Sequence, residues 1–191
     1  QIGEKLLGES GSDDFGSHVT ISGDGSVIAV SNATNNGQVK AYKNNSGTWE
    51  LIGTFNGENS GDQFGYSINL SDDGSIIAIR SLNHDSGKGH VRVFNYISGT
   101  NWSQIGSDID GTNGGDNFGR GVSLSDDGSI VAMGSQDNNS GTGYVRIYQN
   151  NDGSWQQLGS DINGEAIGDE SGHATSLSSD GTIIAIGAPG N

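Results

Sequence analysis

One position that recurs along the chain carries four different side chains able to bind a ligand. The pair Phe-Gly stands at residues 15–16, 64–65 and 118–119, and Ser-Gly takes its place at 171–172. The residue after each glycine is a hydroxyl, a phenol, a guanidinium or an imidazole: Ser17, Tyr66, Arg120 and His173. If the strands that begin here line one axis, these side chains gather around one opening as a binding site. Neutral drift at an exposed position is the alternative interpretation.

A glycine-rich acidic stretch at residues 108–116 could bind a metal ion. It contains Asp108, Asp110 and Asp116, and similar oxygen-bearing residues recur near 56–62 and 161–169. Clustered oxygen ligands suit calcium, which takes about six to eight of them. The spacing matches neither the EF-hand nor the glycine-rich nonapeptide repeat. Calcium is therefore the metal that the sequence suggests, and turn formation with loop capping is the alternative.

The other reactive residue types form no catalytic pattern. The histidines lack the spacing of a metal motif: His18, His84, His90 and His173. No Gly-x-Ser-x-Gly motif is present. Paired aspartates such as Asp72 and Asp73 occur where turns are expected, so turn chemistry explains them better than acid–base catalysis. The sequence predicts no enzymatic activity and no cofactor beyond the calcium considered above.

These residues are carried by a repeat that extends over the whole chain. Its Asp-Gly pairs start at residues 24, 73, 127 and 180, which gives spacings of 49, 54 and 53 residues. The tryptophans are each 53 residues apart, at Trp49, Trp102 and Trp155. We therefore interpret the 191 residues as a single array of units at approximately 1–49, 50–102, 103–155 and 156–191, the last of them incomplete.

Each unit has the apolar pattern of four short strands. The segment after Phe-Gly alternates apolar and polar residues, and an Asp-Gly turn joins it to a second strand that is apolar at consecutive positions, as at residues 76–79. Such continuous strands are buried on both faces. An alternating third strand and a weaker fourth strand complete the unit. The sequence thus predicts an all-β protein, a β-propeller-type array of four-stranded antiparallel blades, with a β-solenoid as the alternative.

Single side chains and the chain ends add further expectations. We interpret the tryptophans as packing between blades rather than as platforms for sugars. The third strands share a basic position, expected to form a solubilising outward row: Lys40, Arg92 and Arg146.

Residues 1–3 match residues 104–106, which places the start of the chain in a fourth strand. The apolar strand at 182–187 has no third strand after it, so more chain or another subunit is expected to cover this open edge.

The repeat resembles the FG-GAP repeat, the blade unit of integrin-type β-propellers. The resemblance rests on the segments at residues 61–65, 73–74, 76–79 and 187–189. It implies a propeller fold and adhesion-like contacts with proteins. Integrin-type blades often carry a calcium loop in the first hairpin, but its first, third and ninth places would be Asn69, Ser71 and Ile77 here. That calcium site is therefore not carried over to this chain.

Composition narrows the class of protein. With 8 Lys and Arg against 23 Asp and Glu, the net charge is −15, which disfavours nucleic acid as a partner. No cysteine is present, and no apolar run is long enough for a transmembrane helix. We therefore predict a non-enzymatic extracellular or cell-surface binding or structural module that binds protein partners or self-assembles. The alternatives are an accessory propeller of a secreted hydrolase and a calcium-dependent lectin that binds a glycan.

Overall fold

The computed structural model describes residues 1–9 and 13–191, and nearly all its regular structure is β-sheet. The first sheet contains β1 (Val19–Ile21), β2 (Val27–Asn32), β3 (Gln38–Asn45) and β4 (Thr48–Asn56). The second contains β5 (Phe64–Leu70), β6 (Ile76–Ser81), β7 (His90–Ser98), β8 (Asn101–Gln104) and β9 (Ile109–Asp110). The third contains β10 (Val122–Leu124), β11 (Ile130–Ser135), β12 (Tyr144–Asn151), β13 (Ser154–Gln157) and β14 (Ile162–Asn163). The fourth contains β15 (Ala174–Leu177) and β16 (Ile184–Gly187).

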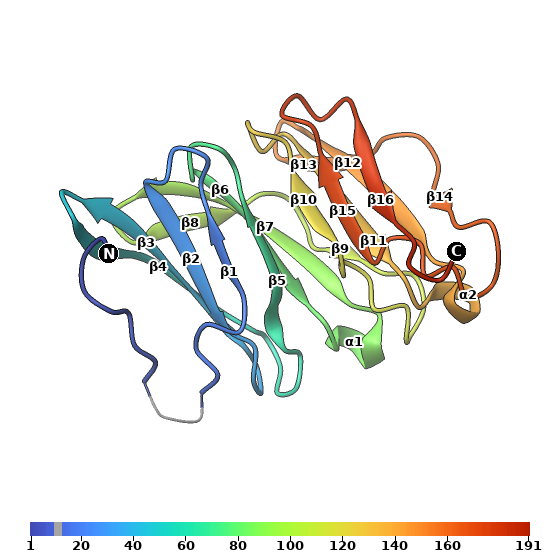
Figure 1. Ribbon diagram of the computed structural model, residues 1–191, viewed down its shortest axis with the longest axis horizontal. Helices are drawn as coiled ribbons and strands as arrows, with labels where there is room; N and C mark the ends of the chain where they lie inside the picture. Colours follow the sequence, from blue (N-terminus) through green and yellow to red (C-terminus); the bar gives the residue numbers. More distant parts are fainter. Residues whose placement is uncertain (10–12) are drawn as a thin grey trace.

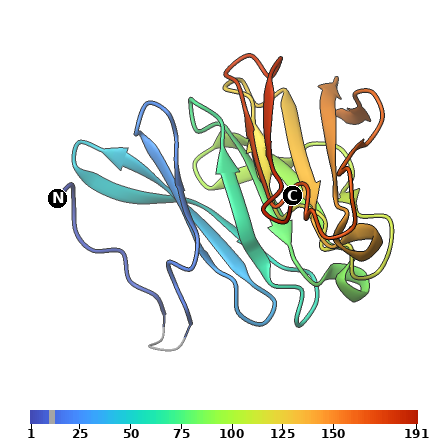
Figure 2. The ribbon, with the colours of Figure 1, turned by 45° about the vertical axis from the view of Figure 1, so that its right-hand side comes forward.

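The four sheets are successive blades of a propeller-type array (Figure 1). Within each sheet, consecutive strands pair antiparallel, while β9 and β14 are short additions beside β7 and β12. The first strands of neighbouring sheets contact one another in the order β1, β5, β10 and β15. Figure 2 shows the sheets fanning out from this line of first strands. The all-β, propeller-type prediction is confirmed, and the antiparallel meander excludes the parallel coils of a solenoid.

The hairpin turns follow the local chemistry that the sequence predicts. Gly74 has φ of +69°, a conformation that glycine adopts without strain. The carboxylate of Asp73 accepts hydrogen bonds from the Ser75 backbone N–H at 2.9 Å and from the Ser71 hydroxyl at 2.8 Å. The turn delivers the chain into β6, where Ile77 and Ile79 are fully buried. In the first three blades, the Asp-Gly pair therefore leads into a core strand.

The tryptophans connect each blade to the one before it. Trp102 Nε1 donates to the carbonyl of Ile52 at 2.8 Å, and Trp155 Nε1 donates to the carbonyl of Ile105 at 2.9 Å. Their rings also pack against the hydrophobic core. The interpretation of the tryptophans as packing between blades is confirmed. Trp49 makes the same bond to Ile2 at 3.2 Å, although residues 1–7 form no strand, contrary to the prediction.

The basic position on the third strands does not form a solubilising row. Arg92 is buried, donates to the carbonyl of Asn56 at 2.8 Å and lies over the Phe64 ring at 4.4 Å. Arg146 donates to the hydroxyl of Thr112 at 2.9 Å. Both side chains reach the loop that precedes their own blade. The prediction was wrong because this loop folds over the strand and covers the position that alternation alone places in solvent.

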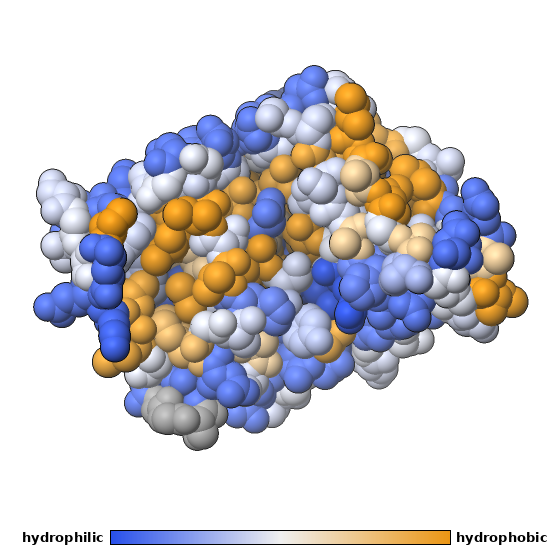
Figure 3. Space-filling view, in the orientation of Figure 1, coloured by the Kyte–Doolittle hydropathy of each residue, from blue (hydrophilic) through white to orange (hydrophobic). Residues whose placement is uncertain are grey.

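The two end blades expose apolar side chains. Figure 3 shows apolar surface over β1 and β2 at one end of the array and over β15 and β16 at the other. Val19, Ile21 and Ile183 are among the exposed apolar residues. The two described helices, α1 (His84–Gly87) and α2 (Asn138–Gly141), are single turns, and no helix in the described part of the chain has the length and apolar character needed to span a membrane.

Candidate functional site

Tyr66, Arg120 and His173 lie in one row that crosses three blades. Arg120 Nη2 lies 3.1 Å from His173 Nε2. The Tyr66 ring lies 5.2 Å from the His18 ring, and Arg80 Cζ lies 5.4 Å from the centre of the Tyr66 ring. The charges of Arg80 and Arg120 act on each other across the gap between blades. We name these five residues, His18, Tyr66, Arg80, Arg120 and His173, the axial row.

Arg80 is the most deeply buried member of the axial row. Its side chain is completely buried at the end of β6. Its Nε donates to the carbonyl of Phe118 at 2.8 Å and its Nη2 to the carbonyl of Asn117, whereas Nη1 has no hydrogen-bond partner among the described residues. Burial, followed by the charge of Arg120, lowers the pKa of Arg80 to about 9. The guanidinium therefore stays charged at neutral pH with one nitrogen unsatisfied.

The axial row is cationic although the protein is acidic. Burial first, and then the charge of Arg80, lower the pKa of His18, which keeps that imidazole neutral at pH 7. Within residues 1–9 and 13–191, neither Arg80 nor Arg120 forms an ion pair with a carboxylate. The charge of Asp137 acts on Arg80 without forming an ion pair, and repulsion from more distant acidic groups is screened beyond about 8 Å at physiological salt. The arrangement can therefore bind an anionic group through charge-assisted hydrogen bonds.

Ser17, the fourth residue predicted for this site, does not join the axial row. Its hydroxyl lies 3.3 Å from Ser31 Oγ on its own blade. The row instead includes His18 and Arg80, which sequence reasoning missed. Arg80 carries a visible signal, because it is a charged residue at the end of an apolar strand where the other units have smaller side chains: Ser31, Gly134 and Gly187.

A hollow on the first blade lies away from the axial row. It has a volume of about 630 Å³ and is lined by polar residues of the first blade, including Asn35, Asn36 and Gln38. Lys40, the cation in its lining, is already paired with Glu9 at 2.6 Å. We place the candidate site at the axial row instead, since neither of its arginines forms an ion pair with a described residue.

Asp108, Asp110 and Asp116 do not converge on one point. Asp108 accepts a hydrogen bond from Gln104 Nε2 at 2.7 Å. Asp116 is buried and caps its own loop, accepting from the backbone N–H of Asn113 at 2.9 Å. In the described part of the chain, the carboxylate oxygens of these three aspartates do not come close enough together to share a metal ion. Loop capping accounts for Asp116, and the predicted calcium cluster is not assembled.

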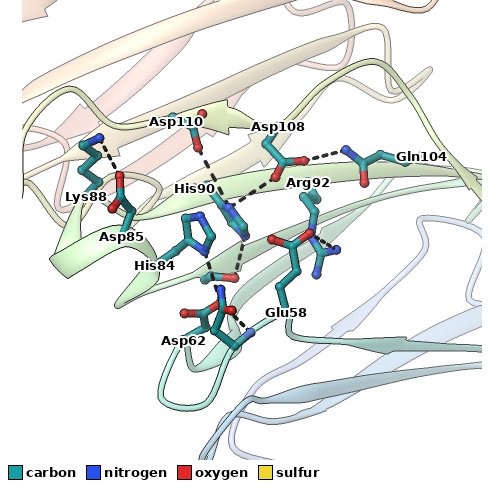
Figure 4. Close-up of polar contacts among 12 residues, drawn as sticks. Glu58, Asp62, His84, Asp85, Lys88, His90, Arg92, Gln104, Asp108 and Asp110 are labelled. Carbon is teal, nitrogen blue, oxygen red and sulfur yellow. Dashed lines mark hydrogen bonds and ion pairs between the residues drawn. The ribbon is translucent and has the colours of Figure 1, made fainter.

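A second polar cluster surrounds His90 (Figure 4). His90 Nε2 lies 2.8 Å from Ser81 Oγ, and its Nδ1 lies 3.5 Å from Asp108 Oδ2. The order serine, histidine, aspartate is that of a nucleophilic triad. Ser81 and His90 are both completely buried, however, so no substrate carbonyl can reach the hydroxyl. This contact therefore stabilises the second blade rather than performing acyl transfer.

The electrostatics of the His90 cluster follow from its burial. Burial first, and then the neighbouring His84, lower the pKa of His90 to about 4. The two imidazole rings stack with their centres 3.9 Å apart. Burial and then Asp108 raise the pKa of Asp110. His90 is thus neutral at physiological pH.

Comparisons with known proteins identify the fold alone. No family model matches the chain, and no curated protein matches it in sequence. Among solved structures it is similar to a "putative 6-phosphogluconolactonase" from Bacteroides fragilis, with a TM-score of 0.57, 16% identity, and coverage of 88% of this chain and 41% of that one. A protein of the same description from Bacteroides uniformis gives a TM-score of 0.57 and 15% identity, and the match covers 88% of this chain and 42% of that one. For TolB from Acinetobacter baumannii the TM-score is 0.50 and the identity 18%, with 88% of this chain and 37% of that one covered.

These similarities agree with the propeller-type fold. The chain spans about two fifths of the length of each of these three structures. At such identities, likeness of fold carries no activity from one protein to another, because one fold serves many functions. The FG-GAP resemblance stays a prediction.

Proposed function

We propose that this protein is a non-enzymatic binding module whose axial row binds an acidic segment of a partner protein. The observation that carries the proposal is a pair of arginines that form no ion pair with any described residue: Arg80, buried with an unsatisfied nitrogen, and Arg120, whose charge acts on it. A carboxylate of the partner bonds to Arg120, which is only partly buried, and the charge of the enclosed Arg80 strengthens the attraction. Hydrogen bonds between a guanidinium and a carboxylate are about twice as strong as those between neutral groups.

The adhesion-like role and its location belong to the same proposal. The FG-GAP resemblance favours contacts with proteins, and the polar, acidic, cysteine-free composition favours an extracellular or cell-surface module. The burial of Ser81 and His90 supports a role without catalysis. The tryptophan ring nitrogens bond to neighbouring blades, which disfavours their use as platforms for a glycan.

The experiment measures the binding of a fluorescently labelled hexa-aspartate peptide by fluorescence anisotropy, with a hexa-asparagine peptide as the uncharged control. The decisive variant is Arg120→Gln, because Arg120 is part of the row but is less buried than Arg80. The matched variant is Lys43→Gln, which removes one positive charge from an exposed position on β3. We expect Arg120→Gln to weaken binding about tenfold, as loss of one charged hydrogen bond predicts.

Three outcomes would contradict the proposal. Absence of hexa-aspartate binding to the unmodified protein would remove the anion site. Equal weakening by Arg120→Gln and Lys43→Gln would indicate non-specific attraction to the whole surface. Inorganic phosphate provides the third comparison, because the named 6-phosphogluconolactonase neighbours suggest a phosphorylated ligand. Binding of phosphate without binding of the peptide would assign the row to a small anion instead of a protein.

A further inference from the structure

A group of nitrogen and oxygen atoms outside the axial row lies close enough together to hold a metal ion. It consists of Glu58, His84 and His90, each of which offers one ligand atom within 4.8 Å of the other two. Glu58 lies in the loop between β4 and β5, His84 begins α1, and His90 begins β7. Figure 4 shows the three side chains meeting where these segments come together on the second blade. Residues distant in sequence are thus brought to one point by the fold.

His90 provides a second and independent indication of a ligand. Its side chain is completely buried, and its Nδ1 has no hydrogen-bond partner among the described residues. The nearest carboxylate oxygens, on Asp108 and Asp110, lie 3.5 Å and 4.0 Å away, beyond ordinary hydrogen-bond distance. A buried imidazole nitrogen without a partner is unfavourable, because folding has removed the water that would bind it.

The surrounding residues resemble the outer shell of a metal site. His84 Nδ1 lies 3.1 Å from Asp62 Oδ2, and His90 Nε2 lies 2.8 Å from Ser81 Oγ. In metal sites, a histidine ligand bonds through its other nitrogen to a carboxylate or another oxygen, which orients the ring. Both rings here have one nitrogen engaged in this way, and the second nitrogen forms no hydrogen bond within the described part of the chain.

Among the third strands of the first three blades, β7 is the one that begins with a histidine. At the place of His90, the first blade has Gln38 and the third blade has Tyr144, which each begin the corresponding third strand. Tyr144 is packed against the Phe118 ring, with ring centres 6.0 Å apart. The fold therefore accepts other side chains at this place, and the imidazole is a feature of the second blade rather than a requirement of the repeat.

We propose that Glu58, His84 and His90 bind a divalent transition-metal ion of the zinc class. Two imidazoles and one carboxylate suit zinc, whereas calcium prefers a shell made of oxygen atoms alone. Tetrahedral zinc at bond lengths of about 2.0–2.1 Å holds its ligand atoms about 3.4 Å apart. Because the atoms lie within 4.8 Å of one another, the group has to contract by at most about 1.4 Å.

One ring has to turn for both nitrogens to face the same ion. The rings stack with an angle of 28° between their planes. A metal ion lies close to the plane of each imidazole that binds it, and two stacked rings do not share such a point. His84 is the ring that turns, since its side chain is 20% exposed while His90 is enclosed. Glu58 is exposed, and its carboxylate lies 3.3 Å from Arg92 Nη1. It gives up this ion pair when it binds the metal.

Isothermal titration calorimetry with zinc chloride tests this site, and calcium chloride serves as the comparison ion. We expect one zinc ion to bind per chain, and no calcium ion at the same place. His84→Gln and Glu58→Gln each remove one ligand and should weaken zinc binding at least tenfold. Asp62→Asn alters the outer shell and should weaken it about 10- to 100-fold. His173→Gln removes a histidine from the axial row and should leave zinc affinity unchanged.

The variants distinguish a built metal site from scattered binding of zinc. Failure of the unmodified protein to bind zinc would overturn the proposal, and so would unchanged affinity in His84→Gln and Glu58→Gln. Equal weakening by His173→Gln would indicate scattered binding to surface groups. Glu58→Gln guards against loss of folding, because Glu58 is exposed and outside the core. Circular dichroism of each variant confirms that the sheets are intact.

Discussion

Strands β1 and β5 occupy the same place in the repeat but differ sharply in burial. Val19 and Ile21 of β1 are 68% and 60% exposed, whereas the corresponding Ile68 and Leu70 of β5 are 9% and 7% exposed. Strand β5 contacts β1 and β2 on one side and β10 on the other, whereas β1 contacts its neighbouring blade through β5. The difference teaches that a blade's core is completed by its neighbours and not by its own sequence.

The other end of the array shows the same effect on the second strands. Ile183 is 71% exposed, but Val27 at the corresponding place in the first blade is 3% exposed. The turn glycine of the following blade, Gly74, lies directly against Val27. Ile183 belongs to the last described blade and has no such turn against it. The sequence analysis expects more chain or another subunit to cover this edge. That expectation stays a prediction.

The largest expected effect comes from the repeated phenylalanine. Phe118 is completely buried and stacks on Tyr144, whereas Phe15 at the corresponding place in the first blade is only partly buried. We expect Phe118→Ala to lower the free energy of unfolding by about 3–5 kcal/mol and Phe15→Ala by about 1 kcal/mol. Urea denaturation of both variants measures the difference. Equal losses would show that burial by neighbouring blades does not determine stability.

A smaller effect distinguishes two turn glycines with the same backbone conformation. Gly25 and Gly128 have φ of +71° and +67°, so alanine is strained equally at both. A Cβ at Gly128 would meet the side chain of Ile76 at 2.6 Å, but a Cβ at Gly25 would meet nothing within 4 Å. We expect Gly25→Ala to destabilise by about 1–2 kcal/mol from backbone strain alone. Gly128→Ala should cost about 1–3 kcal/mol more through overpacking.

Thermal and urea unfolding of the two glycine variants provide the measurement. Unmodified protein and each variant are compared under the same conditions. A loss at Gly25 as large as that at Gly128 would contradict the inference that the turn of one blade packs on the second strand of the previous blade. A smaller difference than expected would show that Ile76 can move aside.

The fold could be predicted because its signals are local and repeated. The Asp-Gly turns, the apolar second strands and the tryptophans each recur at nearly constant spacing. The structure places them as turns, core strands and contacts between blades. The short strands β9 and β14 were not predicted, because two residues give no periodic pattern.

The candidate sites could be predicted only in part, because their contacts join distant segments. The position after the repeated glycine identified Tyr66, Arg120 and His173, since repetition marks it directly. Arg80 belongs to a different repeat position and bonds to a carbonyl 38 residues away. The group around His90 joins a loop, a helical turn and the start of a strand, with no motif spacing. Alternation likewise gave the wrong surroundings for Arg92, whose partners are Asn56 at the end of β4 and Glu58 in the loop that follows.

The smallest expected effect concerns a feature that does not depend on neighbouring blades. In the last described blade, the backbone N–H of Thr182 first, and then the Ser178 and Thr182 hydroxyls, lower the pKa of Asp180 to about 2. In the first blade, the Ser22 hydroxyl first, and then the backbone N–H of Ser26, lower the pKa of Asp24. Both groups are exposed, so these shifts come from turn chemistry within each hairpin.

The sign of the pH dependence follows from the lowered pKa of Asp180. Its carboxylate stabilises the folded state above the unfolded pKa of about 3.9, and that contribution is lost as the pH falls through about 2. We expect a carbon-13 NMR titration of the side-chain carboxyl to give a midpoint near 2 for Asp180, and a midpoint below 3.9 for Asp24. Asp180→Asn should remove the stability change of this hairpin between pH 4 and 2 while leaving Asp24 unaffected. Because the first and last blades use the same local bonds in this turn, a normal midpoint at Asp180 would show that its turn depends on a neighbouring blade for its geometry.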